Sequence, residues 1–158
     1  MKVLSTSAQR VQDALDAAGV QTRIVEHDVP ARTSAEAAAV LGCTVGQIAK
    51  SLVFRSASGA PVLVIASGAH RVDEAKIAAL AGEAIGKADA SFVRAATGYA
   101  IGGIPPLAHS TRPRTFIDRN LLAYETVYAA GGTPHAMFPI SPAELVRVAE
   151  GTVAETAP

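Results

Sequence analysis

The sequence predicts one α+β domain in which a mixed, mostly antiparallel or barrel-like sheet is surrounded by helices. Segments with helical and strand periodicity are interleaved irregularly, which argues against a regular βαβ array. Two strand-like segments, 49–55 and 61–67, are separated by the short turn SASGA and should pair as a hairpin. The length of 158 residues fits one domain, predicted at 1–150, followed by a flexible tail over 151–158.

Helices are predicted where apolar residues recur at helical spacing or follow a capping sequence. Residues 7–18 show this spacing and are followed by Gly19. The patterns Thr33-Ser-Ala-Glu36 and Ser141-Pro-Ala-Glu144 should begin two further helices, the first ending near Gly42. Two more helices are predicted over 73–81 and 88–96.

Strands are predicted over the hairpin and over four other segments. The second hairpin strand, PVLVIAS, is apolar on both faces, which indicates a central strand covered on both sides. The four other segments are 22–27, 115–118, 125–130 and 135–140.

The composition excludes several classes of protein. The formal net charge is zero, so no global field attracts nucleic acid or a membrane, although a local patch can exist. No apolar run approaches the roughly 20 residues that span a bilayer, and the N-terminus lacks the apolar core of a secretory signal. The single cysteine, Cys43, suits a reducing cytosol and is predicted to be a small buried filler. We expect a cytoplasmic protein.

Lys50 is unusual for its position. Side chains alternate between the two faces of a strand, so Lys50 shares a face with Ile48, Leu52 and Phe54. One interpretation is a lysine near the end of a strand that reaches solvent. The other is a cation at the mouth of a pocket, able to stabilise a phosphate or a developing oxyanion.

The segment TGYAIGGIPPLAH (97–109) combines glycines and prolines with apolar residues. Glycines allow backbone N–H groups to approach a ligand, and prolines hold a loop in shape. The segment is therefore either a tight structural crossover or a rigid cradle for a polar ligand. It is not a phosphate-binding P-loop, because no GK[ST] follows, and the dinucleotide spacing GxGxxG is absent.

Two other regions contain candidate residues with two interpretations each. His135 follows a flexible Gly131-Gly132 turn and either makes a structural hydrogen bond or orients a substrate group. The basic residues between 90 and 117 are either solvated surface or a phosphate-binding patch. These are Arg94, His109, Arg112 and Arg114.

In this order and at these distances, several segments resemble the YbaK/ProX family of trans-editing aminoacyl-tRNA deacylases, whose fold also forms the editing domain of bacterial prolyl-tRNA synthetases. The segments are a strand ending in His27, the helix start at 33–37, GQIAKSLVF (46–54), PVLVIASG, and TGYAIGGIPP (97–106). The resemblance covers nearly the whole chain. It implies hydrolysis of the ester of a mischarged tRNA that carries a small amino acid.

The resemblance also implies roles for individual residues. It assigns the catalytic role to Lys50 and substrate shaping to the loop from Gly102 to Pro106, with no metal, other cofactor or protein nucleophile. Water or a ribose hydroxyl of the substrate would attack the ester. Ile104 and Leu107 would narrow the pocket. The candidate substrate-binding residues are Ser51, Tyr99, Gly102, Gly103, Ile104, Pro105, Pro106, Gly131, Gly132 and His135.

The expected partner is the acceptor end of a mischarged tRNA, contacted by Arg94, Arg112 and Arg114, and a synthetase partner would add specificity. Two alternatives stay open. The pocket of a non-catalytic module would hold a tRNA end or an aminoacyl-nucleotide without turnover. A small-ester or amide hydrolase would act on free metabolites without tRNA.

Overall fold

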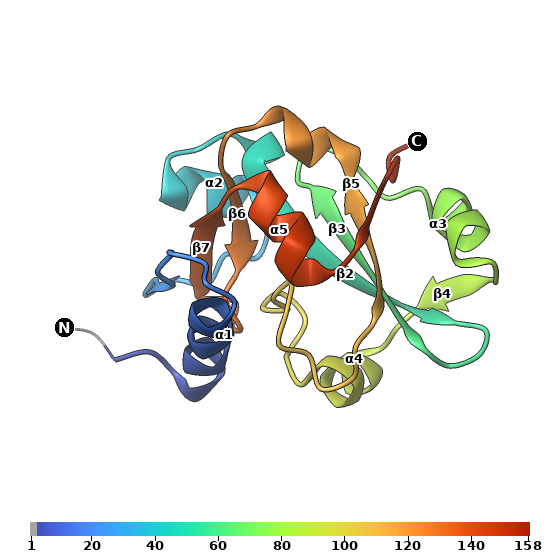
Figure 1. Ribbon diagram of the computed structural model, residues 1–158, viewed down its shortest axis with the longest axis horizontal. Helices are drawn as coiled ribbons and strands as arrows, with labels where there is room; N and C mark the ends of the chain where they lie inside the picture. Colours follow the sequence, from blue (N-terminus) through green and yellow to red (C-terminus); the bar gives the residue numbers. More distant parts are fainter. Residues whose placement is uncertain (1–2) are drawn as a thin grey trace.

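The computed structural model describes residues 3–158 and contains one eight-stranded mixed sheet with helices around it (Figure 1). The strand order is β1-β7-β6-β2-β3-β5-β8, and β4 pairs with the end of β2. Four of the seven strand pairings are antiparallel and three are parallel. The strands are β1 (Val25–Glu26), β2 (Ile48–Ser56), β3 (Pro61–Ser67), β4 (Ile85–Lys87), β5 (Arg114–Asp118), β6 (Val127–Ala130), β7 (Ala136–Ile140) and β8 (Thr152–Ala154). The predicted α+β fold class is confirmed.

The helices begin at the capping residues that the sequence indicates. The Thr33 hydroxyl accepts a hydrogen bond from the Glu36 amide at 3.1 Å, and Gly42 ends that helix with φ of 70°. Ser141 caps the last helix in the same way, through the Glu144 amide. The helices are α1 (Thr6–Ala17), α2 (Ser34–Leu41), α3 (Glu74–Ala81), α4 (Ala90–Thr97) and α5 (Pro142–Ala149), with 3₁₀ turns η1 (Val45–Gln47) and η2 (Arg119–Ala123).

The β2–β3 hairpin forms the centre of the sheet, as predicted. Its register runs from Ala49 opposite Ser67 to Arg55 opposite Pro61. Every residue of β3 is buried, because hydrophobic clusters lie on both faces of the sheet. One cluster includes α1, α5 and the 97–109 segment, and another lies under α3.

The strand predicted over 22–27 is much shorter in the structure. It is reduced to Val25–Glu26, because the Gln12 amide group of α1 bonds the Thr22 carbonyl and the Ile24 amide instead. The segment therefore packs against α1 before it joins the edge of the sheet beside β7. No helix within residues 3–158 is long and apolar enough to cross a membrane.

The prediction of a flexible tail over 151–158 is wrong. Residues 152–154 form β8, which pairs in parallel with β5. The Thr156 carbonyl then accepts a hydrogen bond from the Asp73 amide at 2.7 Å, and the Lys76 ammonium donates to the Ala157 carbonyl. These bonds hold the C-terminal segment between β5 and α3.

Candidate functional site

A cavity of about 550 Å³ opens beside the first half of β2. The regions that enclose it are the start of α2, η1, strand β2, the turn after β3, the 101–104 loop, and the facing parts of β6 and β7. Its lining is mostly apolar, with a few polar groups, as is typical of a small-molecule site. The lining includes Arg32, Ser34, Ile48, Lys50, Ser51, Leu52, Gly68, Ile101, Gly102, Ile104, Ala130 and Met137.

The cavity lies where β2 has a strand neighbour on one side only. β3 accompanies β2 along its length, but β6 pairs only with Ile48 and Ala49, and β4 joins only from Phe54 onward. Between them, no strand of the described chain pairs with residues 50–53 on that side. Backbone groups along this edge can therefore bond a ligand.

Lys50 begins this open stretch of β2 and is half-buried. It lines the cavity together with Ile48 and Leu52, the apolar neighbours that strand alternation predicts. Lys50 forms no ion pair with a carboxylate within residues 3–158. An ammonium in apolar surroundings without a counter-ion favours an anion that enters the cavity.

The Ser51 hydroxyl is the second unpaired polar group of the site. Its oxygen is buried and has no hydrogen-bond partner in the part of the chain that the structure describes. Ser51 also lines the cavity, next to Lys50. Because an unpaired buried hydroxyl is unfavourable, a ligand that bonds it gains affinity.

The wall opposite β2 is the 97–109 segment, which internal hydrogen bonds fix in place. The Tyr99 ring is fully buried, and its hydroxyl donates to the Ala108 carbonyl at 2.9 Å. The Thr97 hydroxyl bonds the Tyr99 amide at 3.1 Å, and the Arg10 guanidinium stacks on the Tyr99 ring. Tyr99 therefore supports the loop from behind and does not line the cavity.

His109 is the last residue of the same segment. Its Nε2 lies 2.6 Å from the Pro105 carbonyl oxygen, so this nitrogen carries the proton and donates. Burial lowers the pKa of His109, which favours the neutral ring, while the bond to Pro105 acts in the opposite direction. The ring also meets Tyr99 edge-on. His109 thus has a structural role, because its contacts fix the loop between Tyr99 and Pro105.

Two glycines allow the loop tip to approach the cavity and the neighbouring turn. Gly102 has φ of 92°, which disfavours other residues, and it lines the cavity. A Cβ on Gly103 would lie 2.6 Å from the Thr133 backbone, so only glycine fits against the β6–β7 turn. Ile104 follows with its side chain buried in the cavity wall.

Several of the predicted substrate-binding residues lie behind this wall. Pro105 and Pro106 are buried, and Gly131 and Gly132 pack against Ile24 and the Ser7 carbonyl, respectively. None of the four lines the cavity, and neither does Leu107, which packs against the core.

His135 also lies outside the cavity. Its Nδ1 is 3.0 Å from the His27 carbonyl oxygen, and its own carbonyl accepts from the His27 amide. These two bonds join the segment before α2 to the start of β7. The contacts match the structural interpretation of His135.

The three arginines predicted to contact tRNA do not line the cavity. The Arg114 guanidinium donates to the Ala81 and Leu80 carbonyls at the end of α3, and Arg112 pairs with Glu150 at 3.0 Å. Arg94 is exposed on α4, which lies at the lower edge of Figure 1, while α2 lies at the upper left.

Cys43, predicted to be a small buried filler, is half-buried beside α2. It packs against the cluster that contains Ile48 and Met137, and burial raises the pKa of its thiol. The thiol is therefore kept in its protonated form and behaves as a small apolar group.

Sequence reasoning missed the contribution of α2, the turn at Gly68 and β7. The capping pattern Thr33–Glu36 predicts that a helix begins there, but it does not predict that this helix start lies beside the cavity. Gly68 packs against Ser34, which brings the turn after β3 to the start of α2. Met137 and Ala130 reach the cavity because β6 and β7 pair beside β2.

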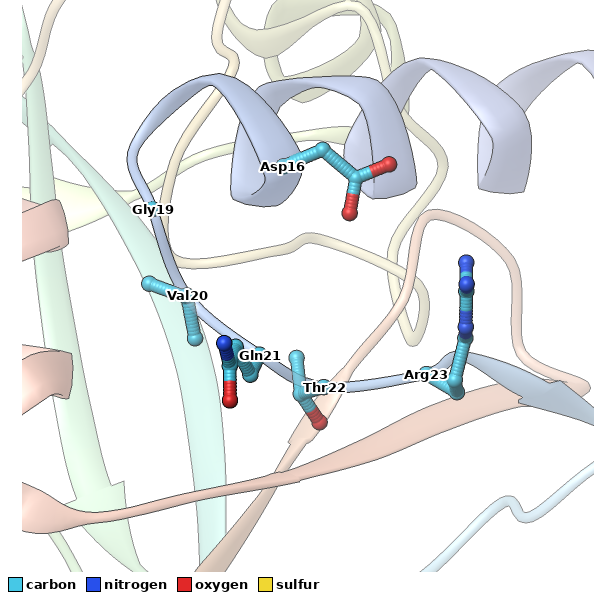
Figure 2. Close-up of a pocket in the computed structure, with 6 residues that line it drawn as sticks. All are labelled: Asp16, Gly19, Val20, Gln21, Thr22 and Arg23. Atoms are coloured by element: carbon cyan, nitrogen blue, oxygen red, sulfur yellow. The ribbon is translucent and has the colours of Figure 1, made fainter.

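A second hollow of about 530 Å³ lies where the chain leaves α1 (Figure 2). One continuous segment, from Asp16 to Arg23, supplies its lining. The Asp16 carboxylate accepts a hydrogen bond from Gln12 at 3.0 Å. None of the predicted site residues lies here.

The fold and the cavity define a small α+β domain whose cavity is lined by Lys50, which has no counter-ion within residues 3–158, and by a loop fixed by hydrogen bonds. The family described as "Aminoacyl-tRNA editing domain" matches residues 28–148, and the chain belongs to this family. The resemblance to the YbaK/ProX deacylases is thereby confirmed.

The chain is also similar to individual proteins. A crystal structure described as "a putative trans-editing enzyme for prolyl tRNA synthetase" is 43% identical, with a TM-score of 0.93 over 99% of both chains. The hypothetical protein APE2540 is 34% identical, with a TM-score of 0.87 over 94% of this chain and 99% of that one. The Bacillus subtilis (strain 168) protein YwhH is 29% identical over 122 residues, which is 77% of this chain and 78% of YwhH.

Proposed function

We propose that this protein is a trans-editing deacylase that hydrolyses the ester of a mischarged tRNA carrying a small amino acid. The observation that carries the proposal is the Lys50 ammonium, which stands without a counter-ion in a cavity of an aminoacyl-tRNA editing domain. The rigid 101–104 loop faces it across that cavity.

In the proposed reaction, the oxygen of water or of a substrate hydroxyl adds to the ester carbonyl. The bond between this carbon and the ribose oxygen then breaks, and a proton goes to the ribose oxygen. With water as the attacking group, the products are the free amino acid and the uncharged tRNA. With a ribose hydroxyl, the acyl group moves to that hydroxyl, and water must then add to release the amino acid. Lys50 would stabilise the oxyanion that forms during the addition. An aminoacyl ester is already activated, so this modest apparatus suffices.

The remaining polar groups would position the amino acid. Backbone groups of the 101–104 loop and of the open edge of β2 would bond its α-amino group and carbonyl. Ile104 and Met137 bound the apolar part of the cavity and favour a small side chain. Discrimination by size is limited, because one methylene changes binding by only about 1–3 kcal/mol.

The similar protein described as a putative trans-editing enzyme for prolyl tRNA synthetase suggests which tRNA to test first. We propose that the substrate is a tRNA acylated with a small, incorrect amino acid, with tRNA for proline as the leading candidate. A synthetase that holds the same tRNA would add specificity that this single domain lacks.

The test is a deacylation screen of the purified protein against several mischarged tRNAs, with Lys50→Ala as the main variant. Removing an oxyanion-stabilising group typically costs about 10²- to 10³-fold in rate, and we expect a loss of that order. Lys87→Ala is the control, because Lys87 is an exposed lysine on β4, at the far end of β2.

Thermal unfolding of both variants shows whether the fold is kept. Unchanged hydrolysis by folded Lys50→Ala would refute the role of the lysine. Binding of mischarged tRNA without turnover would instead identify a non-catalytic binding module, and hydrolysis of simple esters with no effect of tRNA would identify a small-ester hydrolase.

A further inference from the structure

Two exposed arginines have no side-chain partner among the described residues: one lines the cavity, and the other lies three residues after the lining residue Gly68. Arg32 lines the cavity directly, just before the start of α2. Arg71 follows the turn that begins at Gly68, another lining residue. Neither guanidinium forms a hydrogen bond or an ion pair within the described residues.

The contact between Gly68 and Ser34 brings these two arginines to the same region. A Cβ on Gly68 would lie 2.6 Å from the Ser34 Cβ, so the turn and the start of α2 touch. Arg32 is two residues from one side of that contact, and Arg71 is three residues from the other. The backbones of both arginines therefore lie near the side of the cavity where α2 begins.

Within the described residues, neither arginine forms an ion pair with a carboxylate. Glu36 accepts a hydrogen bond from the Arg32 backbone amide at 3.2 Å. Asp73 caps α3 through the amides of Ala75 and Lys76, at 3.0 and 3.3 Å. Both acids thus serve helix starts, and the two guanidinium groups stay available to an external anion.

The three arginines that the sequence indicated as tRNA contacts, Arg94, Arg112 and Arg114, differ from Arg32 and Arg71 in their surroundings. Arg114 is bonded to two carbonyls of α3, and Arg112 pairs with Glu150. Arg94 is exposed on α4, away from α2 (Figure 1). None of these three arginines lines the cavity that holds Lys50.

We infer that Arg32 and Arg71 hold the phosphates of the tRNA acceptor end while the aminoacyl ester occupies the cavity. The inference rests on the proposed function. The amino acid is attached to the terminal nucleoside, so the phosphates of that nucleoside and its neighbours must lie just outside the cavity mouth. Exposed, unpaired guanidinium groups are suited to phosphates, whose contacts position a nucleic acid without reading its sequence.

The test compares two substrates that carry the same amino acid: a full mischarged tRNA and the aminoacyl ester of adenosine, which has no phosphate. We expect Arg32→Ala and Arg71→Ala each to raise KM for the tRNA by about 3- to 10-fold, with a clearly smaller effect on the adenosine ester. The slope of log affinity against log salt concentration should decrease by about one for each arginine removed. Lys87→Ala is the control for loss of an exposed positive charge.

Arg94→Ala tests the competing surface. A larger loss of tRNA affinity in Arg94→Ala than in Arg32→Ala and Arg71→Ala would overturn the inference. So would equal losses on both substrates, since the arginines would then act on the ester and not on phosphates. If the unaltered protein hydrolyses neither substrate, the proposed function fails. If it hydrolyses both while the two variants behave as it does, only this inference fails.

Discussion

The buried Ser51 hydroxyl is unfavourable for the free protein and is available to a ligand of the cavity. A buried hydroxyl without a partner costs about 1–3 kcal/mol of desolvation. This desolvation lowers the stability of the free protein, because the Ser51 oxygen has no hydrogen-bond partner among residues 3–158. A bound substrate that supplies a hydrogen bond would recover it.

We therefore expect Ser51→Ala to keep or raise the free energy of unfolding while it lowers kcat/KM for the mischarged tRNA by about 10-fold, the value of one hydrogen bond. Denaturant unfolding and deacylation kinetics on the same preparation measure the two quantities. Thr156→Val is the matched control, because the Thr156 hydroxyl is also buried and unpaired but lies beyond β8. That variant should keep full activity. A Ser51→Ala protein with lower stability and normal activity would contradict the assignment.

The sequence predicts some of these residues and not others, for physical reasons. Strand alternation alone places Lys50 among apolar neighbours, so its unusual position can be recognised from the order of residues. Arg32 and Met137 reach the cavity through the packing of α2 and β7 against β2, which local patterns do not encode. For Tyr99, the pattern does not say which way the ring points, and the hydroxyl bonds Ala108.

At the scale of elements, the 97–109 loop and the β6–β7 turn depend on each other. The loop tip approaches the turn closely enough that Gly103 has no room for a side chain beside Thr133. Hydrogen bonds from Tyr99 and His109 hold the rest of the loop. The cavity wall is rigid because both of its supports are fixed.

Gly103→Ala should consequently damage stability and catalysis together. Forcing a methyl group into a packed site costs about 1–3 kcal/mol, and relief of the clash would move the loop away from Thr133 and widen the cavity. We expect a lower thermal midpoint and a reduced kcat/KM. Gly86→Ala is the control, since nothing lies within 4 Å of its added Cβ, and it should have little effect on either measurement. Normal activity in Gly103→Ala would show that the loop position is not important for catalysis.

The elements that the sequence missed are short and depend on their neighbours. β4 and β8 have three residues each, too few for an alternation pattern to be recognised. β4 exists through its pairing with the end of β2, and β8 through its pairing with β5. The longer segments, such as the β2–β3 hairpin and the helix after Ser141, contain enough local information to be predicted.

Across the whole molecule, the cavity and the C-terminal strand lie in different parts of the sheet. The cavity is built around β2, β6 and β7, whereas β8 is the last strand at the opposite edge. Because the formal net charge is zero, the tRNA binding that we propose would rely on local charges and not on a global field.

Deletion of residues 151–158 should therefore reduce stability without removing the site. The deletion takes away the β5–β8 ladder, the buried Ala154 and the bond from Asp73 to the Thr156 carbonyl. We expect a loss of about 2–4 kcal/mol, or a fall in Tm of roughly 5–15 °C, with hydrolysis retained at temperatures where the shortened protein is folded. Removal of Pro158 alone, an exposed residue, is the control and should leave Tm unchanged. An unchanged Tm in the longer deletion would mean that β8 contributes nothing to the fold. Aggregation of the shortened protein would agree with β8 covering the edge of β5, because an uncovered strand edge pairs readily with another chain.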